Sequence, residues 1–363
     1  MKLTLALDRN FNNFDLLRLI AATAVIVGHA PAIAPTGTTV DLVSRLVGFD
    51  YSGSLAVKFF FFLSGLVVAN SLFDKKNMAL FIVSRAARLF PGLIVCVLLS
   101  VIVGSLISTK EWGEYISHHD TISYMYNNSL LREIKWTLPG VFEKNPINTV
   151  NGSFWTLVYE VACYAWLVVF WKLKMFDGPK RGAAICIGII AASFFFPTLI
   201  PPFNALQTAW QLPGCFFLGV FFAAVKGHIE INLGVGFALW LLAYLCRSTA
   251  MFQSLFYVAL FYTSIYIATR ELVVAYCKLP VDMSYGVYLY GYIVQQIVKQ
   301  VWPEHGLLWN IALAFPISLL IGYLSFIVIE RPTMQRVKVA ANFVEKLKNL
   351  RIFQHPKAKI KTT

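Results

Sequence analysis

The chain has 363 residues and a formal net charge of +13, and 58% of its residues are hydrophobic while 13% are charged. Its mean hydropathy of +0.66 is far above that of an average globular domain. This composition excludes an ordinary soluble domain and predicts a polytopic membrane protein. The six cysteines form no C-x-x-C motif and no Cys/His cluster, so we expect neither a disulfide framework nor a metal site.

The first stretch, "MKLTLALDRNFNNFD", is too polar to resemble a cleaved signal, so the apolar run after it is expected to be a retained first span. Apolar windows predict an all-α, polytopic transmembrane helix bundle of about ten spans: 14–32, 52–72, 89–108, 152–171, 182–201, 206–225, 231–246, 251–269, 281–302 and 307–329. Residues 1–335 are expected to form this transmembrane domain. The outer loop at about 109–151 is long enough to carry a short helix and to cover a site.

The distribution of lysine and arginine residues along the chain agrees with the predicted topology. With the N-terminus placed inside, most lysines and arginines fall in connections on the cytoplasmic side, which predicts that both termini are cytoplasmic. The basic tail at 336–363 has the composition of a membrane-surface helix, and anionic lipid is its expected partner. We expect no nucleic-acid binding, because no recognition module accompanies the charge.

Arg18 and His29 lie in the first predicted span, eleven residues apart. This spacing places both side chains on one helix face, about 16 Å apart along the axis. Ionisable residues inside a span usually face the bundle interior or a water-filled pathway. The alternative is that Arg18 reaches the inner headgroups and His29 marks the outer interface.

Arg85 and Arg88 are three residues apart, at the predicted cytoplasmic start of the third span. On a helix they would be neighbours that could clamp a phosphate group together. The alternative is that they are ordinary basic residues at an inner membrane edge, as positive-inside sorting supplies.

Glu160 lies eight residues into the fourth predicted span. A carboxyl group there must be protonated, paired or functional. Because this span is predicted to begin on the outer side, we expect Glu160 in the outer half of the bilayer, at a depth similar to that of His29. The alternative is a structural salt bridge with a nearby arginine.

Several motifs occur in an order that resembles the acyltransferase-3 family of integral membrane acyltransferases. Besides the R-x10-H and R-x-x-R pairs, they are "FFFLSG", "GSFWTLVYE", "SYGVYLY" and "IERP". The resemblance covers residues 12 to 335, without the C-terminal SGNH domain of longer members. Many members carry a histidine where this sequence has Gly291, so no role for that second histidine is carried over.

The resemblance implies a multi-pass enzyme of the bacterial inner membrane. It would move an acyl group, usually acetyl from acetyl-CoA, to a hydroxyl of an extracytoplasmic carbohydrate such as O-antigen or exopolysaccharide. The acceptor, which can be lipid-linked, and the oligomeric state are left open, and no metal is expected.

The residues and the resemblance together suggest a division of roles. Arg18, Arg85 and Arg88 are expected to bind the acyl-CoA, whose phosphates stay near the cytoplasm. His29 is the expected general base, with Glu160 holding its imidazole in place, and a covalent acyl-histidine stays an alternative. The rival interpretation is a secondary transporter or flippase of a glycan or glycolipid, since intramembrane Arg, His and Glu also mark transport pathways. No internal repetition supports that rival.

Overall fold

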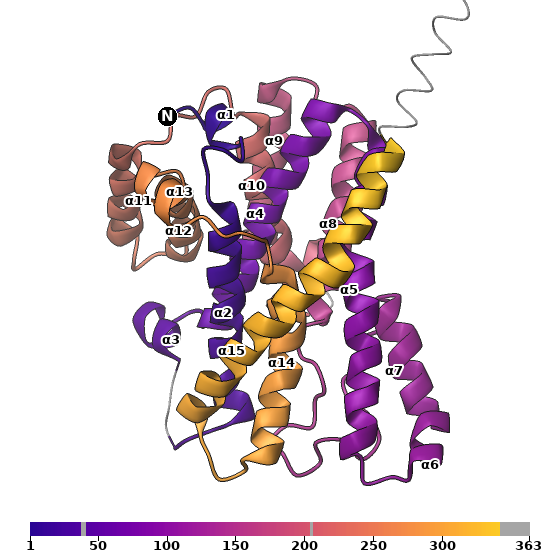
Figure 1. Ribbon diagram of the computed structural model, residues 1–363. Coiled ribbons are helices and arrows are strands. Elements are labelled where there is room, and N and C mark those ends of the chain that lie inside the picture. The colour runs from indigo at the N-terminus through magenta and orange to yellow at the C-terminus, as the bar shows by residue number, and fades with distance from the viewer. Residues whose placement is uncertain (38–40, 204–205, 342–363) are drawn as a thin grey trace, which may run out of the picture.

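The structure is a computed structural model that describes residues 1–37, 41–203 and 206–341, and it is built from helices (Figure 1). These residues contain no strand, only an isolated bridge between Lys2 and Glu230. The predicted all-α fold is therefore confirmed. Residues 342–363, which make up most of the predicted basic tail and its expected lipid contact, lie outside the described residues.

Each predicted span coincides with a helix. These helices are α2 (Phe14–Ile33), α4 (Ser52–Lys75), α5 (Met78–Ile107), α8 (Trp155–Lys172), α9 (Pro179–Phe195), α10 (Leu212–Ala224), α11 (Leu233–Leu245), α12 (Phe252–Ala268), α14 (Ser284–Val301) and α15 (Leu307–Ser325). In the described parts of the chain, four helical segments are long and apolar enough to cross a bilayer: Phe14–Ile33, Ser52–Lys75, Met78–Ile107 and Leu307–Ala341. The count of ten spans and the cytoplasmic termini stay predictions.

Helix α5 begins earlier than the apolar pattern predicted. The side chain of Asn77 accepts a hydrogen bond from the backbone N–H of Leu80 and so caps the helix ahead of the apolar run. Arg85 and Arg88 therefore lie more than one turn inside a 30-residue helix, not at its start. Their side chains project from a rigid element into the bundle.

Helix α15 does not stop at the predicted end of the last span. It passes through one π-helical turn, η4 (Phe326–Glu330), and continues as helix to residue 341. Such turns often occur at functional sites. Here the turn ends on Glu330, whose side chain is fully buried.

Two glycines set the closest helix contact of the core. A Cβ atom at Gly65 of α4 would collide with the backbone of Phe216 in α10, and one at Gly219 of α10 would collide with the backbone of Phe62 in α4. Small residues at such positions let helix backbones approach closely. Helices α4 and α10 accordingly lie side by side in Figure 1.

Helix α14 packs against both α2 and α15. Gly291 faces α2, where an added Cβ atom would lie 2.8 Å from Cγ1 of Ile26. The position where the resemblance would place a second histidine is therefore filled by the neighbouring helix.

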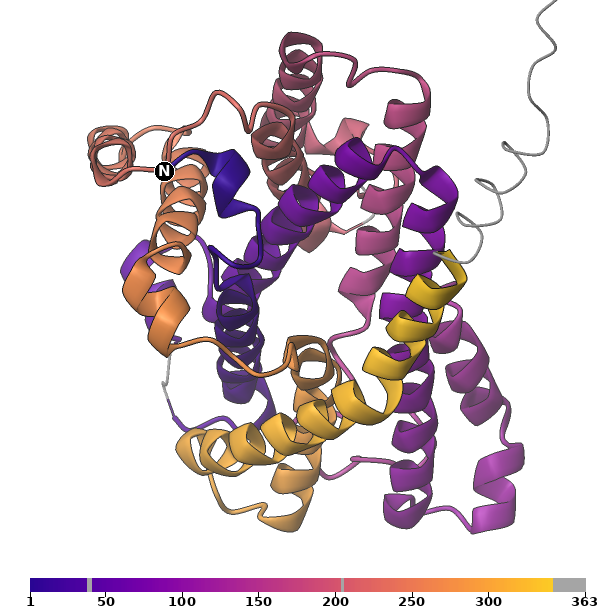
Figure 2. The ribbon, with the colours of Figure 1, turned by 45° about the horizontal axis from the view of Figure 1, so that its top comes forward.

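The predicted outer loop carries two short helices, α6 (Trp112–Ser117) and α7 (His119–Ser129), which pack beside α5 at the end of the molecule opposite the N-terminus (Figure 1). Helices α11, α12 and α13 (Glu271–Tyr276) form a group at one side of the bundle, to the left in Figure 1 and Figure 2, with α12 next to α2.

The non-helical segment just before α8 lies inside the bundle, where α14 binds it. Gln296 of α14 donates to the carbonyl of Thr149 at 2.6 Å, and Asn151 donates to the carbonyl of Leu289 at 2.8 Å. Non-helical backbone is tolerated at membrane depth when protein groups satisfy it in this way. As a result α8 begins inside the bundle, at Trp155.

Candidate active site

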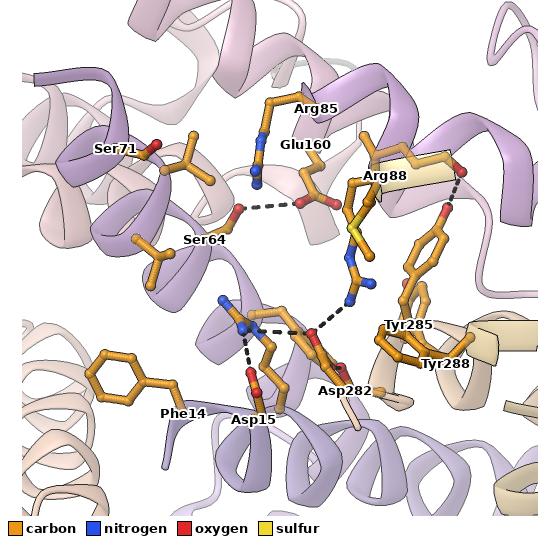
Figure 3. A pocket seen from close by; sticks show the side chains of 18 of the residues that line it. Phe14, Asp15, Ser64, Ser71, Arg85, Arg88, Glu160, Asp282, Tyr285 and Tyr288 are labelled. Atoms are coloured by element: carbon orange, nitrogen blue, oxygen red, sulfur yellow. Dashed lines mark hydrogen bonds and ion pairs between the residues drawn. The ribbon is translucent and has the colours of Figure 1, made fainter. Parts of the chain in front are cut away.

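A cavity of about 720 Å³ lies between α2, α4, α5, α8 and the start of α14 (Figure 3). Four of the five predicted site residues line it: Arg18, Arg85, Arg88 and Glu160. His29 is not among its lining residues. The structure therefore brings the three predicted donor-binding arginines together with the glutamate, and leaves the histidine outside.

The two ends of the cavity differ in chemistry. The rim carries exposed basic side chains: Arg9, Lys75, Arg331 and Lys338. The inner end is lined by buried side chains: Val57, Thr156, Leu157 and Tyr288. A cationic rim with a mostly apolar inner end suits a ligand that has an anionic head and a less polar arm.

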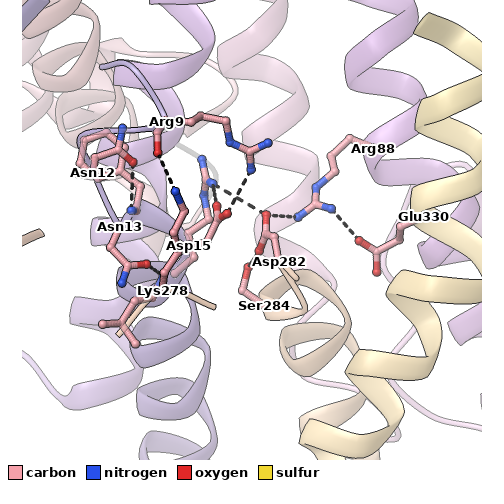
Figure 4. A network of polar contacts seen from close by, with 12 residues as sticks. Arg9, Asn12, Asn13, Asp15, Arg88, Lys278, Asp282, Ser284 and Glu330 are labelled. Atoms are coloured by element: carbon pink, nitrogen blue, oxygen red, sulfur yellow. Dashed lines mark hydrogen bonds and ion pairs between the residues drawn. The ribbon is translucent and has the colours of Figure 1, made fainter. Parts of the chain in front are cut away.

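Arg88 is held by two carboxylates (Figure 4). Its Nη1 donates to Glu330 and its Nη2 to Asp282, each at 2.7 Å. Its guanidinium also lies over the ring of Tyr285, at 5.6 Å. Glu330 is fully buried, so this pairing removes the cost of an isolated charge inside the bundle.

Asp282 also connects Arg88 to α2, through Arg18. It lies in the connection between α13 and α14, and its carboxylate is 3.7 Å from Nη1 of Arg18, which also binds Asp15 at 3.0 Å. Burial alone would raise the pKa of Asp282, but the guanidinium groups of Arg88 and Arg18 outweigh it and hold that pKa below its ordinary value. Opposite charges thus alternate from Asp15 to Glu330 across α2, the connection before α14, α5 and η4.

Arg85 differs from its neighbour. It is half-buried and lines the cavity, yet it forms no hydrogen bond or ion pair with any residue that the structure describes. Figure 3 shows its guanidinium pointing into the cavity between Ser64 and Glu160. The expectation that Arg85 and Arg88 act as one clamp is therefore not matched by their surroundings.

Glu160 is anchored by hydroxyl groups. Ser64 of α4 donates to its Oε1 at 3.2 Å, Tyr164 donates to the same oxygen, and the two hydroxyls lie 2.8 Å from each other. Tyr164 follows Glu160 by one turn of α8, which explains why these two side chains meet.

The predicted pairing of Glu160 with His29 is not found among the described residues. Glu160 shares the cavity of Arg18 and Arg85, and among the described contacts it has none with His29. It is the sixth residue of α8, which begins inside the bundle at Trp155. Glu160 does not hold the His29 imidazole in this structure.

His29 lies near the C-terminal end of α2, half-buried against Tyr292 of α14. The two rings meet edge to face, with centroids 4.9 Å apart. Its Nδ1 is buried and has no hydrogen-bond partner among the described residues. Tyr292 follows the cavity residue Tyr288 by one turn of α14, so the cavity residue and the ring that contacts His29 are about 6 Å apart along that helix.

Sequence reasoning missed Asp282, Glu330 and Ser64. Ser64 and Glu330 lie within the motifs "FFFLSG" and "IERP", and Asp282 lies two residues before "SYGVYLY". The sequence does show Asp282 and Glu330 as charged residues at the edges of predicted spans. It does not indicate which residues they contact. No group of three or more His, Cys, Asp or Glu side chains that would suit a metal ion occurs in residues 1–37, 41–203 and 206–341.

A helical membrane bundle with a charged cavity at one end is found in the broad class of membrane enzymes and transporters. Comparison with known proteins narrows the class to which this chain belongs. The sequence pattern described as "Acyltransferase domain", that of the acyltransferase-3 family, matches residues 11–331. The chain therefore belongs to the acyltransferase-3 family and is an acyltransferase. The rival interpretation as a transporter or flippase is set aside, because the family is one of acyltransferases.

Two relatives cover most of the chain. One is the "O-acetyl transferase" of Shigella phage Sf6, 25% identical over 315 residues, with 79% of this chain and 85% of the relative covered. The other is "Nodulation protein 10" of Rhizobium leguminosarum bv. viciae, 26% identical over 356 residues, with 89% and 93% covered. No solved structure matches the chain.

Proposed function

We propose that the protein is an O-acetyltransferase that moves acetyl from cytoplasmic acetyl-CoA to a hydroxyl of an extracytoplasmic carbohydrate, in the inner membrane of a bacterium. The observation that carries the proposal is a cavity with a basic rim, in a member of an acyltransferase family, whose Arg85 has no ion pair among the residues that the structure describes. The name of the phage relative, "O-acetyl transferase", supports acetyl as the group and oxygen as the acceptor atom.

The donor fits the two ends of the cavity. The phosphates of acetyl-CoA would lie at the end of the cavity that Arg18, Arg85 and Arg88 line, with Arg85 offering charge-assisted hydrogen bonds. The narrow pantetheine arm would extend toward Tyr288 and bring the thioester near the level of His29. Glu160 would act at the donor side, as an anchored carboxylate facing Arg85 (Figure 3).

His29 would act as the general base. It would take the proton of the acceptor hydroxyl as the oxygen attacks the thioester carbonyl, the C–S bond would break, and the CoA thiolate would leave and be protonated. His29 suits this task because its Nδ1 has no described partner, and a neutral imidazole can accept a proton at the ring nitrogen that carries none.

The test is a comparison of cell-surface glycans by mass spectrometry with and without the gene. The proposal expects one sugar to lose a single acetyl group in the deletion strain and to regain it on complementation. Identical glycan masses, together with no transfer from labelled acetyl-CoA in isolated membranes, would contradict it.

A further inference from the structure

We propose that the two arginines of the R-x-x-R pair have separate tasks: Arg85 binds the phosphate groups of the donor, whereas Arg88 is a positioning residue neutralised by Asp282 and Glu330. This inference rests on the proposed function and specifies which side chain recognises the anionic part of the donor.

Arg88 is held inside the protein by two carboxylates. Both of its terminal nitrogens donate to carboxylates at 2.7 Å, and its side chain is only 17% exposed. Turning Arg88 toward a phosphate would leave the fully buried Glu330 without its cationic partner. Removing one partner of a buried pair is strongly unfavourable, so Arg88 stays with its carboxylates.

Arg18 is tied in a similar way. Asp15 binds it at 3.0 Å, one turn earlier on α2, and Asp282 adds a second contact at 3.7 Å. Asp282 therefore couples Arg18 to Arg88, and together with Glu330 these residues hold α2, α5, α14 and η4 around the cavity (Figure 4).

Of the three arginines predicted to bind the donor, Arg85 is the one whose guanidinium is left available to a ligand. Arg331 also has no ion pair within the described chain, but it lies exposed on the rim of the cavity. Arg18 and Arg88 have carboxylate partners, whereas Arg85 has no ion pair or hydrogen bond within the described chain. The nearby carboxylate of Glu160 is bound by Ser64 and Tyr164 instead. A guanidinium with five free donors in a partly enclosed site favours phosphate, which accepts two parallel hydrogen bonds from it.

The experiment compares two donors with the full-length protein in membrane vesicles that contain its native acceptor. Acetyl-CoA and acetyl-pantetheine share the thioester, but acetyl-pantetheine lacks the nucleotide and all phosphates. The measured quantity is the ratio of kcat/KM for the two donors, from labelled acetyl transferred to the glycan fraction. This ratio cancels effects on folding and on the shared thioester chemistry, and it reports recognition of the nucleotide with its phosphates.

We expect Arg85→Gln to lower the ratio by about 10- to 150-fold, as loss of a charge-assisted hydrogen bond predicts. Arg88→Gln should lower kcat/KM for both donors by a common factor, keep the ratio within about twofold of the parent and lower the melting temperature. Arg18→Gln should resemble Arg88→Gln.

If the Arg88→Gln protein does not accumulate in the membrane, Glu330→Gln provides a second test of the inference. It weakens one contact of Arg88 while Arg85 stays intact, and it should keep the parental ratio. A ratio that falls as far in Arg88→Gln or Glu330→Gln as in Arg85→Gln would overturn the division of tasks and leave the proposed function standing. A parent protein that transfers acetyl from neither donor would overturn the proposed function, and a parent ratio near one would refute phosphate recognition by Arg85.

Discussion

At the scale of single residues, the proposed chemistry depends most on His29, which meets Tyr292 and keeps an unpartnered Nδ1. We expect His29→Ala to reduce acetyl transfer by about 10²- to 10⁴-fold, the usual contribution of a general base. Membrane insertion should persist, because an apolar residue replaces a polar one in a helix. The measurement is labelled acetyl transferred per unit of inserted protein.

His305 provides the matched control for this variant. It is exposed in the connection before α15, where it packs on Trp309, outside the cavity. His305→Ala should keep activity close to the parental value. If His29→Ala retained more than about a tenth of the parental activity, the base would have to be another group.

At the scale of secondary-structure elements, the contact of α4 with α10 holds one wall of the cavity, because Ser64 precedes the contact residue Gly65. Gly65→Ala would place a methyl group against the backbone of Phe216, which cannot rotate away. We expect the variant to lose about 1–3 kcal/mol of stability through overpacking. Thermal denaturation of the purified protein measures the loss.

Gly188 of α9 is the control substitution, because no described atom outside its own stretch of helix lies within 4 Å of a Cβ atom placed there. Gly188→Ala should leave stability unchanged or raise it by about 0.5–1 kcal/mol, since alanine is the better helix former. Equal melting temperatures for Gly65→Ala and Gly188→Ala would show that the α4–α10 contact tolerates an added methyl group.

At the scale of the whole molecule, the proposed transfer needs the basic rim to face the cytoplasm and the α6–α7 region to face the other side. A single cysteine at Ser117 should react with an impermeant thiol reagent on intact cells or spheroplasts, and one at Arg336 only after the membrane is opened. This follows from the distribution of positive charge and from the placement of α6 and α7 opposite the N-terminus. Both variants need a background in which the native exposed Cys277 is replaced. If position 336 were labelled from outside, the orientation would be the reverse of the predicted one. The basic rim would then face away from cytoplasmic acetyl-CoA.

Much of this protein followed from the sequence alone. Each long apolar run became a helix, because backbone groups in a membrane must be satisfied within the segment itself and helix hydrogen bonds are local. The positions of Arg18, Arg85, Arg88 and Glu160 could be singled out for the same reason: a charge inside an apolar run stands out without any knowledge of its surroundings.

Only the tertiary structure decided which of these residues meet. Arg88 lies 194 positions from Asp282 and 242 from Glu330, and no periodicity within one helix can specify such pairs. The neighbours of Glu160 depended on irregular chain that α14 binds inside the bundle, and the π-helical turn that ends on Glu330 has no signature in the apolar pattern. Side-chain partners depend on how separate helices pack, whereas the helices themselves depend on hydrogen bonds four residues apart. The sequence therefore determined the elements, and the packing determined that, of Arg18, Arg85 and Arg88, Arg85 has no ion pair within the described chain.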